Sequence, residues 1–281
     1  MGHGGVVRRT LIQCAVGILV VATLLAAAGC NPDPPPAPAE PFGEFAVGEF
    51  GGVDGRQNIL RVRPDGNALL ISRQPAAGRL SGEAMGRLRT LLTSEQFRQE
   101  VAREAEWDAK PKNWVCSDQI ITEVSMGALS LSRSGPCGEE DLPPAPAFAE
   151  ILTIVGSARR GEFAGPVDDD QPRLVPVRLE RLDVTSEPGY VIMVDSLGRG
   201  SIRVPGQPTR MGALVPGERD VLRLLIPQLT SSPVTPCQST ERYRLWLDGP
   251  VPVSGFDCQF RGRYPEFRAL VTVLETSFGV R

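Results

Sequence analysis

Four cysteines have the most regular spacing in this chain of 281 residues. Cys116 and Cys137 are 21 positions apart, and Cys237 and Cys258 are 21 positions apart as well. A hairpin folded between two such cysteines brings them together at its open end, and closing the loop contributes ~3 kcal/mol in the chain-entropy model. Four free thiols or a thiolate metal site are the alternatives, but the CxxC spacing of zinc sites is missing. We expect disulfides Cys116–Cys137 and Cys237–Cys258, with no metal and no cofactor.

The residues that most enzymes use for acid–base and nucleophilic chemistry are scarce. The single histidine is His3, in a segment that we expect to be removed, so Ser-His-Asp and Cys-His arrangements are excluded. The two lysines, Lys110 and Lys112, flank a proline and follow no S-x-x-K pattern. The composition does not exclude a pair of carboxylates for glycoside hydrolysis, although nothing singles out one pair among the 33 acidic residues. The sequence predicts no catalytic residue and a protein that is not an enzyme.

Two further stretches have compositions that occur in ligand sites. The Gly-rich stretch 48–55 lacks the P-loop lysine and the GxGxxG spacing, so we expect a loop that precedes a strand. The run Asp168-Asp169-Asp170 lacks the ligand spacing of a calcium loop, so we expect a solvated linker. A net charge of −3 and a pI near 5.5 argue against nucleic acid as a partner.

The N-terminus has the pattern of an export signal. Arg8 and Arg9 precede an apolar run over 11–28, the order that is typical of a signal peptide. The run ends in Ala27-Ala28-Gly29-Cys30, which resembles the bacterial lipobox. In that family the chain is cut before the cysteine, whose thiol then carries diacylglycerol. The resemblance implies lipidation at Cys30 and a location on the extracytoplasmic face of the cell membrane, anchored by that lipid.

Two other interpretations of the N-terminus stay open. About 18 apolar residues just suffice to cross a bilayer, so an uncleaved transmembrane anchor is one alternative, and a soluble secreted protein is the other. The Pro-rich stretch after Cys30 predicts a stiff, extended spacer, which lipoproteins commonly have. The abundance of Ala, Gly, Pro and Arg resembles coding from a GC-rich genome, such as that of an actinobacterium.

The equal cysteine spacing accompanies an internal repeat. The pattern G-x-L followed by L-R-x-L-L over 78–92 recurs 134 positions later, over 212–226, with Ile in the last place. The pattern that begins with P-x-F over 146–154 recurs 119 positions later, over 265–273. The smaller second offset predicts an insertion in the first copy, around 98–114. This insertion holds Trp107 and Trp114, which we expect to cover the fold or to form a contact surface.

Each copy is predicted to fold in the order ββαββα. A strand pair turns at 64–67, and a helix follows with Leu88, Leu91 and Leu92 on one face. A second hairpin lies between the cysteines, and a last helix begins at a proline. We expect an α+β fold of two tandem modules, each an antiparallel sheet with helices on one face. The expected bounds are signal peptide 1–29, tether 30–43, first module 44–156, linker 157–176 and second module 177–281.

Each copy also resembles the emfourins, small bacterial inhibitors of thermolysin-like metallopeptidases. The resemblance rests on Gly51-Gly52, Asp65-Gly66, the L-x-x-L-L helix and Leu142-Pro143-Pro144. It implies a protease inhibitor displayed on the cell surface. The leading interpretation is different: a membrane-anchored lipoprotein with a binding or envelope-structural role and an unidentified envelope protein or ligand as its partner. A binding module of this kind would have a broad apolar groove, which we expect between the copies.

Overall fold

The structure is a computed structural model in which residues 41–281 form one compact unit. It describes residues 41–52, 56–109, 119–134, 142–168, 170, 173–182, 188–231, 242–249, 253–256, 259 and 263–280. The expected lipidation site Cys30 and the cysteines of both expected disulfides, Cys116, Cys137, Cys237 and Cys258, lie outside the described residues.

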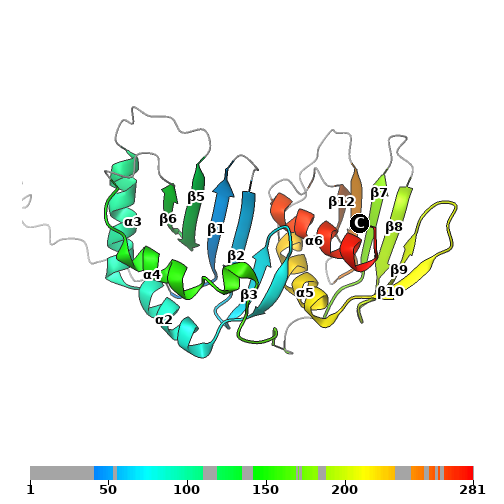
Figure 1. Cartoon of the computed structure of the whole chain (residues 1–281), viewed down its shortest axis with the longest axis horizontal. Helices are drawn as coiled ribbons and strands as arrows, with labels where there is room; N and C mark the ends of the chain where they lie inside the picture. The colour runs from blue at the N-terminus through cyan, green and yellow to red at the C-terminus, as the bar shows by residue number, and fades with distance from the viewer. Residues whose placement is uncertain are drawn as a thin grey trace, which may run out of the picture. The chain divides into compact units, whose positions relative to one another are not determined.

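Two six-stranded antiparallel sheets form the framework (Figure 1). Sheet 1 has the order β4-β3-β2-β1-β5-β6 and sheet 2 the order β10-β9-β8-β7-β11-β12, so the topology is the same. The strands of sheet 1 are β1 (Phe45–Gly51), β2 (Arg56–Val62), β3 (Asn67–Ile71), β4 (Ala76–Arg79), β5 (Ile120–Met126) and β6 (Leu129–Ser134). Those of sheet 2 are β7 (Val177–Leu182), β8 (Pro188–Val194), β9 (Arg199–Arg203), β10 (Arg210–Ala213), β11 (Tyr243–Leu247) and β12 (Val253–Phe256).

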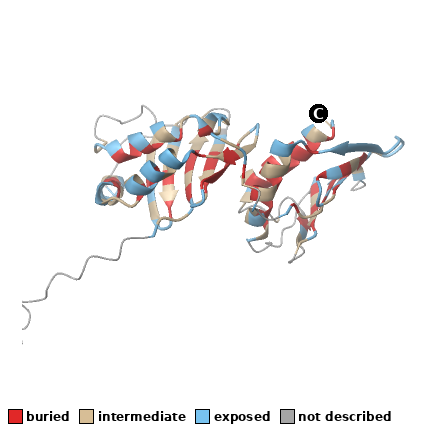
Figure 2. Cartoon of the chain, turned by 90° about the horizontal axis from the view of Figure 1, so that it is seen from below, coloured by how far each residue is buried: buried red, intermediate tan, exposed pale blue. Residues whose placement is uncertain are grey.

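Each module packs its own helices against one face of its sheet. Sheet 1 carries α2 (Gly82–Leu92), α3 (Glu95–Asp108) and α4 (Pro146–Ile154), and sheet 2 carries α5 (Pro216–Thr230) and α6 (Tyr264–Ser277). Figure 2 shows the buried residues on the sides of strands and helices that face each other. The predicted α+β class, with two antiparallel sheet modules, is confirmed.

The predicted element order lacked two strands in each module. Four strands precede the first helix of each module, so β1, β4, β7 and β10 join the expected pairs. The Gly-rich stretch that we expected to be a loop provides the second half of β1, which pairs with β2 and β5 on its two sides. Gly48 fits there because an added Cβ would meet the Phe50 ring at 2.3 Å.

The hairpin turns of the two modules have the same backbone geometry. Gly66 and Gly198 both have positive φ, at 91° and 79°, a conformation that favours glycine. The Gly66 carbonyl accepts a hydrogen bond from Leu80 N–H at 3.0 Å, and the Gly198 carbonyl accepts one from Leu214 N–H at 2.8 Å. These turns align the first strands of the two modules with an offset of 132 residues.

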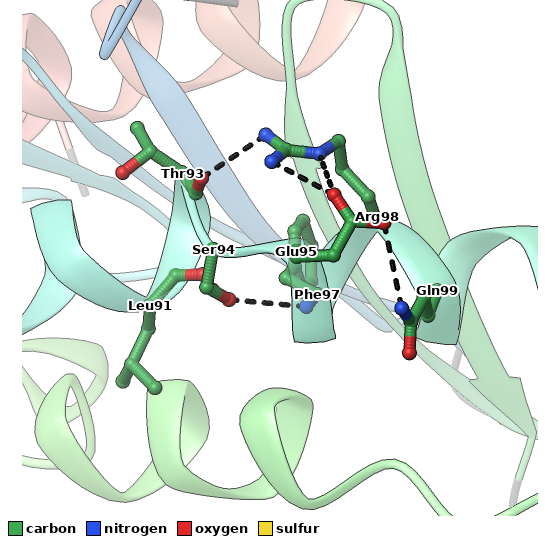
Figure 3. A network of polar contacts seen from close by, with 7 residues as sticks. All are labelled: Leu91, Thr93, Ser94, Glu95, Phe97, Arg98 and Gln99. Atoms are coloured by element: carbon green, nitrogen blue, oxygen red, sulfur yellow. Dashed lines mark hydrogen bonds and ion pairs between the residues drawn. The ribbon is translucent and has the colours of Figure 1, made fainter. Parts of the chain in front are cut away.

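The insertion of the first module is helical over its described part, which belongs to α3. Figure 3 shows how the chain leaves α2 and begins α3. Ser94 caps α3, because its Oγ accepts from Phe97 N–H at 3.1 Å and donates to the Leu91 carbonyl at 2.6 Å. Arg98 donates to the Thr93 carbonyl at 3.0 Å and pairs with Glu95. Trp107 is half-buried on α3, whereas Trp114 lies outside the described residues.

The segment that we expected to be a solvated linker packs against sheet 1. It contains the short 3-10 helix η2 (Ala158–Arg160), which contacts β2 and β3 and buries Ala158. Leu174, further along, is buried near Leu222 of α5 and Leu247 of β11. Gly165 forms a bridge to Arg79 at the edge of β4. Asp168 forms an ion pair with Arg79, and its N–H donates to Asn67 Oδ1 at 3.1 Å. Asp168 is only partly solvated, with 33% of its side chain exposed, because folding supplies a basic partner that is distant in sequence.

The outer face of sheet 1 also receives helices from the second module. Ile59, Leu69 and Ile71 point away from α2 and α4 and join the apolar core that includes α5 and α6. These strands therefore have apolar residues on both faces, which explains why all five residues of β3 are buried.

No helix of the described residues is long and apolar enough to cross a bilayer.

Candidate functional site

A cleft of about 780 Å³ lies between sheet 1 and α6, and we name it the arginine cleft. Four guanidinium groups line it: Arg73, Arg159, Arg160 and Arg268. Neutral polar side chains complete much of the wall, among them Gln57, Asn58, Ser72, Gln74 and Thr272. No acidic residue lines the cleft within the described part of the chain. The residues that line the cleft therefore carry a positive charge, although acids outside the lining pair with two of them and the whole chain has a net charge of −3.

Three separate elements position the arginines. Arg73 lies in the turn after β3, where Ser72 Oγ donates to the Gln74 carbonyl at 2.8 Å and accepts from Gln74 N–H at 3.2 Å. Arg159 and Arg160 belong to η2, which ends at Gly161 with a φ of 83°. Arg268 lies on α6 one turn from Thr272, so both side chains reach the same side of the helix.

The arginines differ in how firmly the fold holds them. Arg159 forms an ion pair with Glu49 of β1, and its side chain is 20% exposed. Arg160 donates to the Gly156 carbonyl at 3.0 Å and to Glu162 at 3.1 Å. Arg268 has neither an ion pair nor a hydrogen bond among the contacts of the described residues, and it lines the cleft while its charge also acts on Tyr243. A guanidinium fork of this kind matches the oxygens of a carboxylate or a phosphate.

A smaller pocket of about 270 Å³ lies on the other side of Arg268, and we name it the tyrosine pocket. Its walls include Arg181, Arg242, Tyr243 and Glu275. Tyr243 and Arg181 are direct cross-strand neighbours, and Tyr190 is the neighbour of Arg181 on the next strand. Strand register therefore places one arginine between two phenols, beneath the last turns of α6.

Glu275 is the buried acceptor of this pocket, with 2% of its surface exposed. Its Oε1 accepts hydrogen bonds from Tyr190 Oη at 2.5 Å and from Tyr243 Oη at 2.9 Å. Burial, followed by the hydrogen bond to Glu275 and its charge, raises the pKa of Tyr190 and of Tyr243 above the ordinary value of 10.0. Both phenols therefore stay protonated as donors at neutral pH.

The first module has no counterpart of this site. The strand offset of 132 residues aligns Tyr190 with Asn58. The offset of 119 residues for the last helix aligns Arg268 with Ala149 and Glu275 with Gly156. None of these three can supply a phenol, a guanidinium group or a carboxylate. The tyrosine pocket therefore belongs to the second module alone, whereas the arginine cleft takes Arg268 from that module and its other arginines from the turn after β3 and from η2.

Comparison with known proteins assigns no family. No family model matches the chain, no curated protein matches it, and no solved structure matches it. The function is therefore argued from the geometry of the chain itself.

The structure corrects one expectation about the site. We expected a broad apolar groove between the modules, but the cleft found there is polar and lined by arginines. The arginine cleft was not predicted, because its residues come from three segments that are distant in sequence. Lys110 and Lys112 lie outside the described residues. Within the described part of the chain, no cluster of three His, Cys, Asp or Glu residues could hold a metal ion.

Proposed function

We propose that the chain is an exported, lipid-anchored binding protein that holds an anionic ligand in the arginine cleft. The observation that carries this proposal is the convergence of Arg73, Arg159, Arg160 and Arg268 on a cleft with no acidic lining residue among those described. A ligand with phosphate or carboxylate groups matches these donors in charge and in geometry. A cleft of about 780 Å³ has the size of a site for a small organic molecule.

The proposed role is binding and not catalysis. No histidine follows the expected cleavage point, which favours recognition over acid–base chemistry. The arginines lie on both modules, so a bound anion would also join the modules more firmly. Ligand binding would therefore stabilise the whole unit of residues 41–281.

Anchoring and ligand binding have separate tests. In the full chain, Cys30→Ala is expected to abolish acyl labelling and to leave unprocessed precursor in the membrane. Normal labelling of that variant contradicts the lipid anchor. No comparison tests the resemblance to emfourins, and inhibition of a metallopeptidase stays a prediction.

The test of ligand binding uses residues 41–281 and three charged probes, namely pyrophosphate, citrate and spermidine. Thermal unfolding in low salt is expected to shift upward with at least one of the two anions, and not with the cation spermidine. Raising the salt concentration to about 0.5 M is expected to reduce that shift, because salt screens exposed charges. Equal shifts with spermidine and with the anions contradict an anion site.

A further inference from the structure

Within the part of the chain that the structure describes, no helix packs on the face of sheet 2 that points away from α5 and α6 (Figure 1). Strand pairing places one row of residues across this outer face: Ser254, Trp246, Arg178, Met193, Ser201 and Met211. The row at the same place in sheet 1 is Ser130, Ser125, Ala46, Arg61, Leu69 and Ala77. The common strand order makes the two rows directly comparable.

The two rows differ in how they are covered. In sheet 1, helices of the second module cover the row, so Leu69 is 2% exposed and Arg61 bonds to Glu266 of α6 at 2.7 Å. In sheet 2, Met193 is 49% exposed and Met211 is 79% exposed. Sheet 2 therefore exposes two methionines at positions where sheet 1 has the partly buried Arg61 and Ala77.

Two further exposed apolar side chains lie at the end of sheet 2 where β8 turns into β9. Leu197 is 61% exposed in the turn after β8, and Val215 is 57% exposed just before α5. The hydrogen bond from Leu214 N–H to the Gly198 carbonyl, at 2.8 Å, keeps these two segments together. Contiguous exposed apolar patches on soluble proteins commonly mark sites that bind a protein, a ligand or a membrane.

Arginine side chains lie on the same outer face of sheet 2 as Met193 and Met211. Arg178 and Arg244 lie over the ring of Trp246, at 4.7 and 5.5 Å from its centroid. Both arginines share one buried acid, Glu180. Arg199 and Arg203 are exposed on β9, on the same face as Ser201. The arginines of this face outnumber its acids, which are Glu180, Asp195 and Asp248.

We propose that this outer face of sheet 2 is a membrane-contact surface that binds anionic lipid headgroups. Methionine and leucine side chains would enter the boundary of headgroups and acyl chains, while the arginines pair with lipid phosphates. The inference rests on the proposed lipid anchor, because Asn31–Glu40 is a tether of ten residues. Such a tether spans at most ~36 Å, so a membrane would be the nearest large surface.

A second copy of this chain fits the outer face less well. In sheet 1 the covering helices, α5 and α6, present apolar residues to the sheet. A head-to-tail copy would instead have to present the outward side of α2 and α4. That side carries the exposed ion pair Arg87–Glu150, at 2.8 Å, which burial against the Arg-rich face would penalise.

The test is co-sedimentation of residues 41–281 with vesicles. Vesicles of phosphatidylglycerol and phosphatidylcholine in equal parts are compared with vesicles of phosphatidylcholine alone. Wild-type protein is expected to bind the anionic vesicles and to dissociate from them in high salt. The double variant Met193→Gln/Met211→Gln is expected to bind them roughly tenfold more weakly. Circular dichroism checks that the variant is folded, as expected for two exposed positions.

Ile120→Gln/Ile121→Gln is the matched control, because it removes two apolar side chains that are 38% and 39% exposed on sheet 1. This control is expected to bind like the wild type. The proposal is overturned if wild-type protein ignores anionic vesicles, or if the methionine variant and the isoleucine control bind equally. Either result leaves the lipid anchor untouched, since acyl labelling of Cys30 tests the anchor separately.

Discussion

Arg61 of β2 donates a hydrogen bond to Glu266 of α6 at 2.7 Å, and this contact joins the two modules. Glu266 is 2% exposed, although it is a carboxylate in the first turn of a helix. Arg263 lies 3.6 Å from the same oxygen, so two guanidinium groups surround one buried acid. A buried carboxylate is costly unless it is paired, so the position of sheet 1 against α6 is set by charge as well as by apolar packing.

We expect Arg61→Met to lower the free energy of unfolding by about 2–3 kcal/mol, less than for a fully unpaired buried charge because Arg263 remains. Arg61→Met/Glu266→Leu is expected to recover most of this loss, because an apolar pair of similar size needs no charge compensation. Urea unfolding of residues 41–281 measures both values. Additive losses in the double variant would show that the two residues are not coupled.

The equivalent helices allow a paired test of burial. Leu91 and Leu225 occupy matching positions in the repeat, so the sequence predicts equal burial for them. In the structure Leu225 is fully buried, whereas Leu91 is only partly buried. Leu225→Ala is therefore expected to cost roughly 2–5 kcal/mol and Leu91→Ala clearly less. Equal losses in chemical unfolding would contradict the structure at α2.

The two buried tyrosines predict a loss of stability in alkali. Because their pKa is raised in the folded state, unfolding releases their protons once the pH exceeds about 10. Below that pH, both tyrosines contribute fully to the free energy of unfolding. Above it, the free energy of unfolding falls by about 1.4 kcal/mol per pH unit for each tyrosine. Tyr190→Phe/Tyr243→Phe is expected to flatten the decline of unfolding free energy between about pH 10 and 11. Tyr264→Phe, which removes a phenol that is 47% exposed, is the control. Equal slopes in both variants contradict the assignment.

The strand register supports a separate prediction about the cysteines. Ile121 pairs with Ser134, so the chain enters β5 and leaves β6 at the same end of their hairpin. Cys116 precedes β5 and Cys137 follows β6, while Cys237 and Cys258 flank β11 and β12 in the same way. A non-reducing peptide map of exported protein is expected to link Cys116 to Cys137 and Cys237 to Cys258. A link between Cys116 and Cys237 refutes this pairing.

The sequence predicted those elements whose signals are local. The helix at 82–92 has three leucines at helical spacing, and the turn at Gly66 has a strong turn composition. Phe148 and Phe267, at matching positions, are 6% and 0% exposed, as expected. In contrast, β4 and β10 have the sequences AAGR and RMGA, without a β-branched or aromatic residue. Only pairing with β3 and β9 makes them strands, so their own composition gave no signal.

The site could not be predicted for a related reason. Arg73 and Arg159 are 86 residues apart, Arg159 and Arg268 are 109 residues apart, and arginine is common throughout the chain. They converge because η2 packs on β2 and β3 while α6 packs on the outer side of the same strands. Tertiary packing creates this proximity, and no local spacing in the sequence encodes it.

The most direct test of the proposed anion site is titration calorimetry of residues 41–281 with pyrophosphate and with citrate in low salt. We predict binding of at least one anion by the wild type, and roughly tenfold weaker binding by Arg268→Gln, because a charge-assisted donor is lost from the cleft. Arg87→Gln removes the same charge from the surface of α2, where Arg87 pairs with Glu150, and is expected to bind like the wild type. Absence of binding by the wild type, or equal affinity for Arg268→Gln and the wild type, would contradict the account.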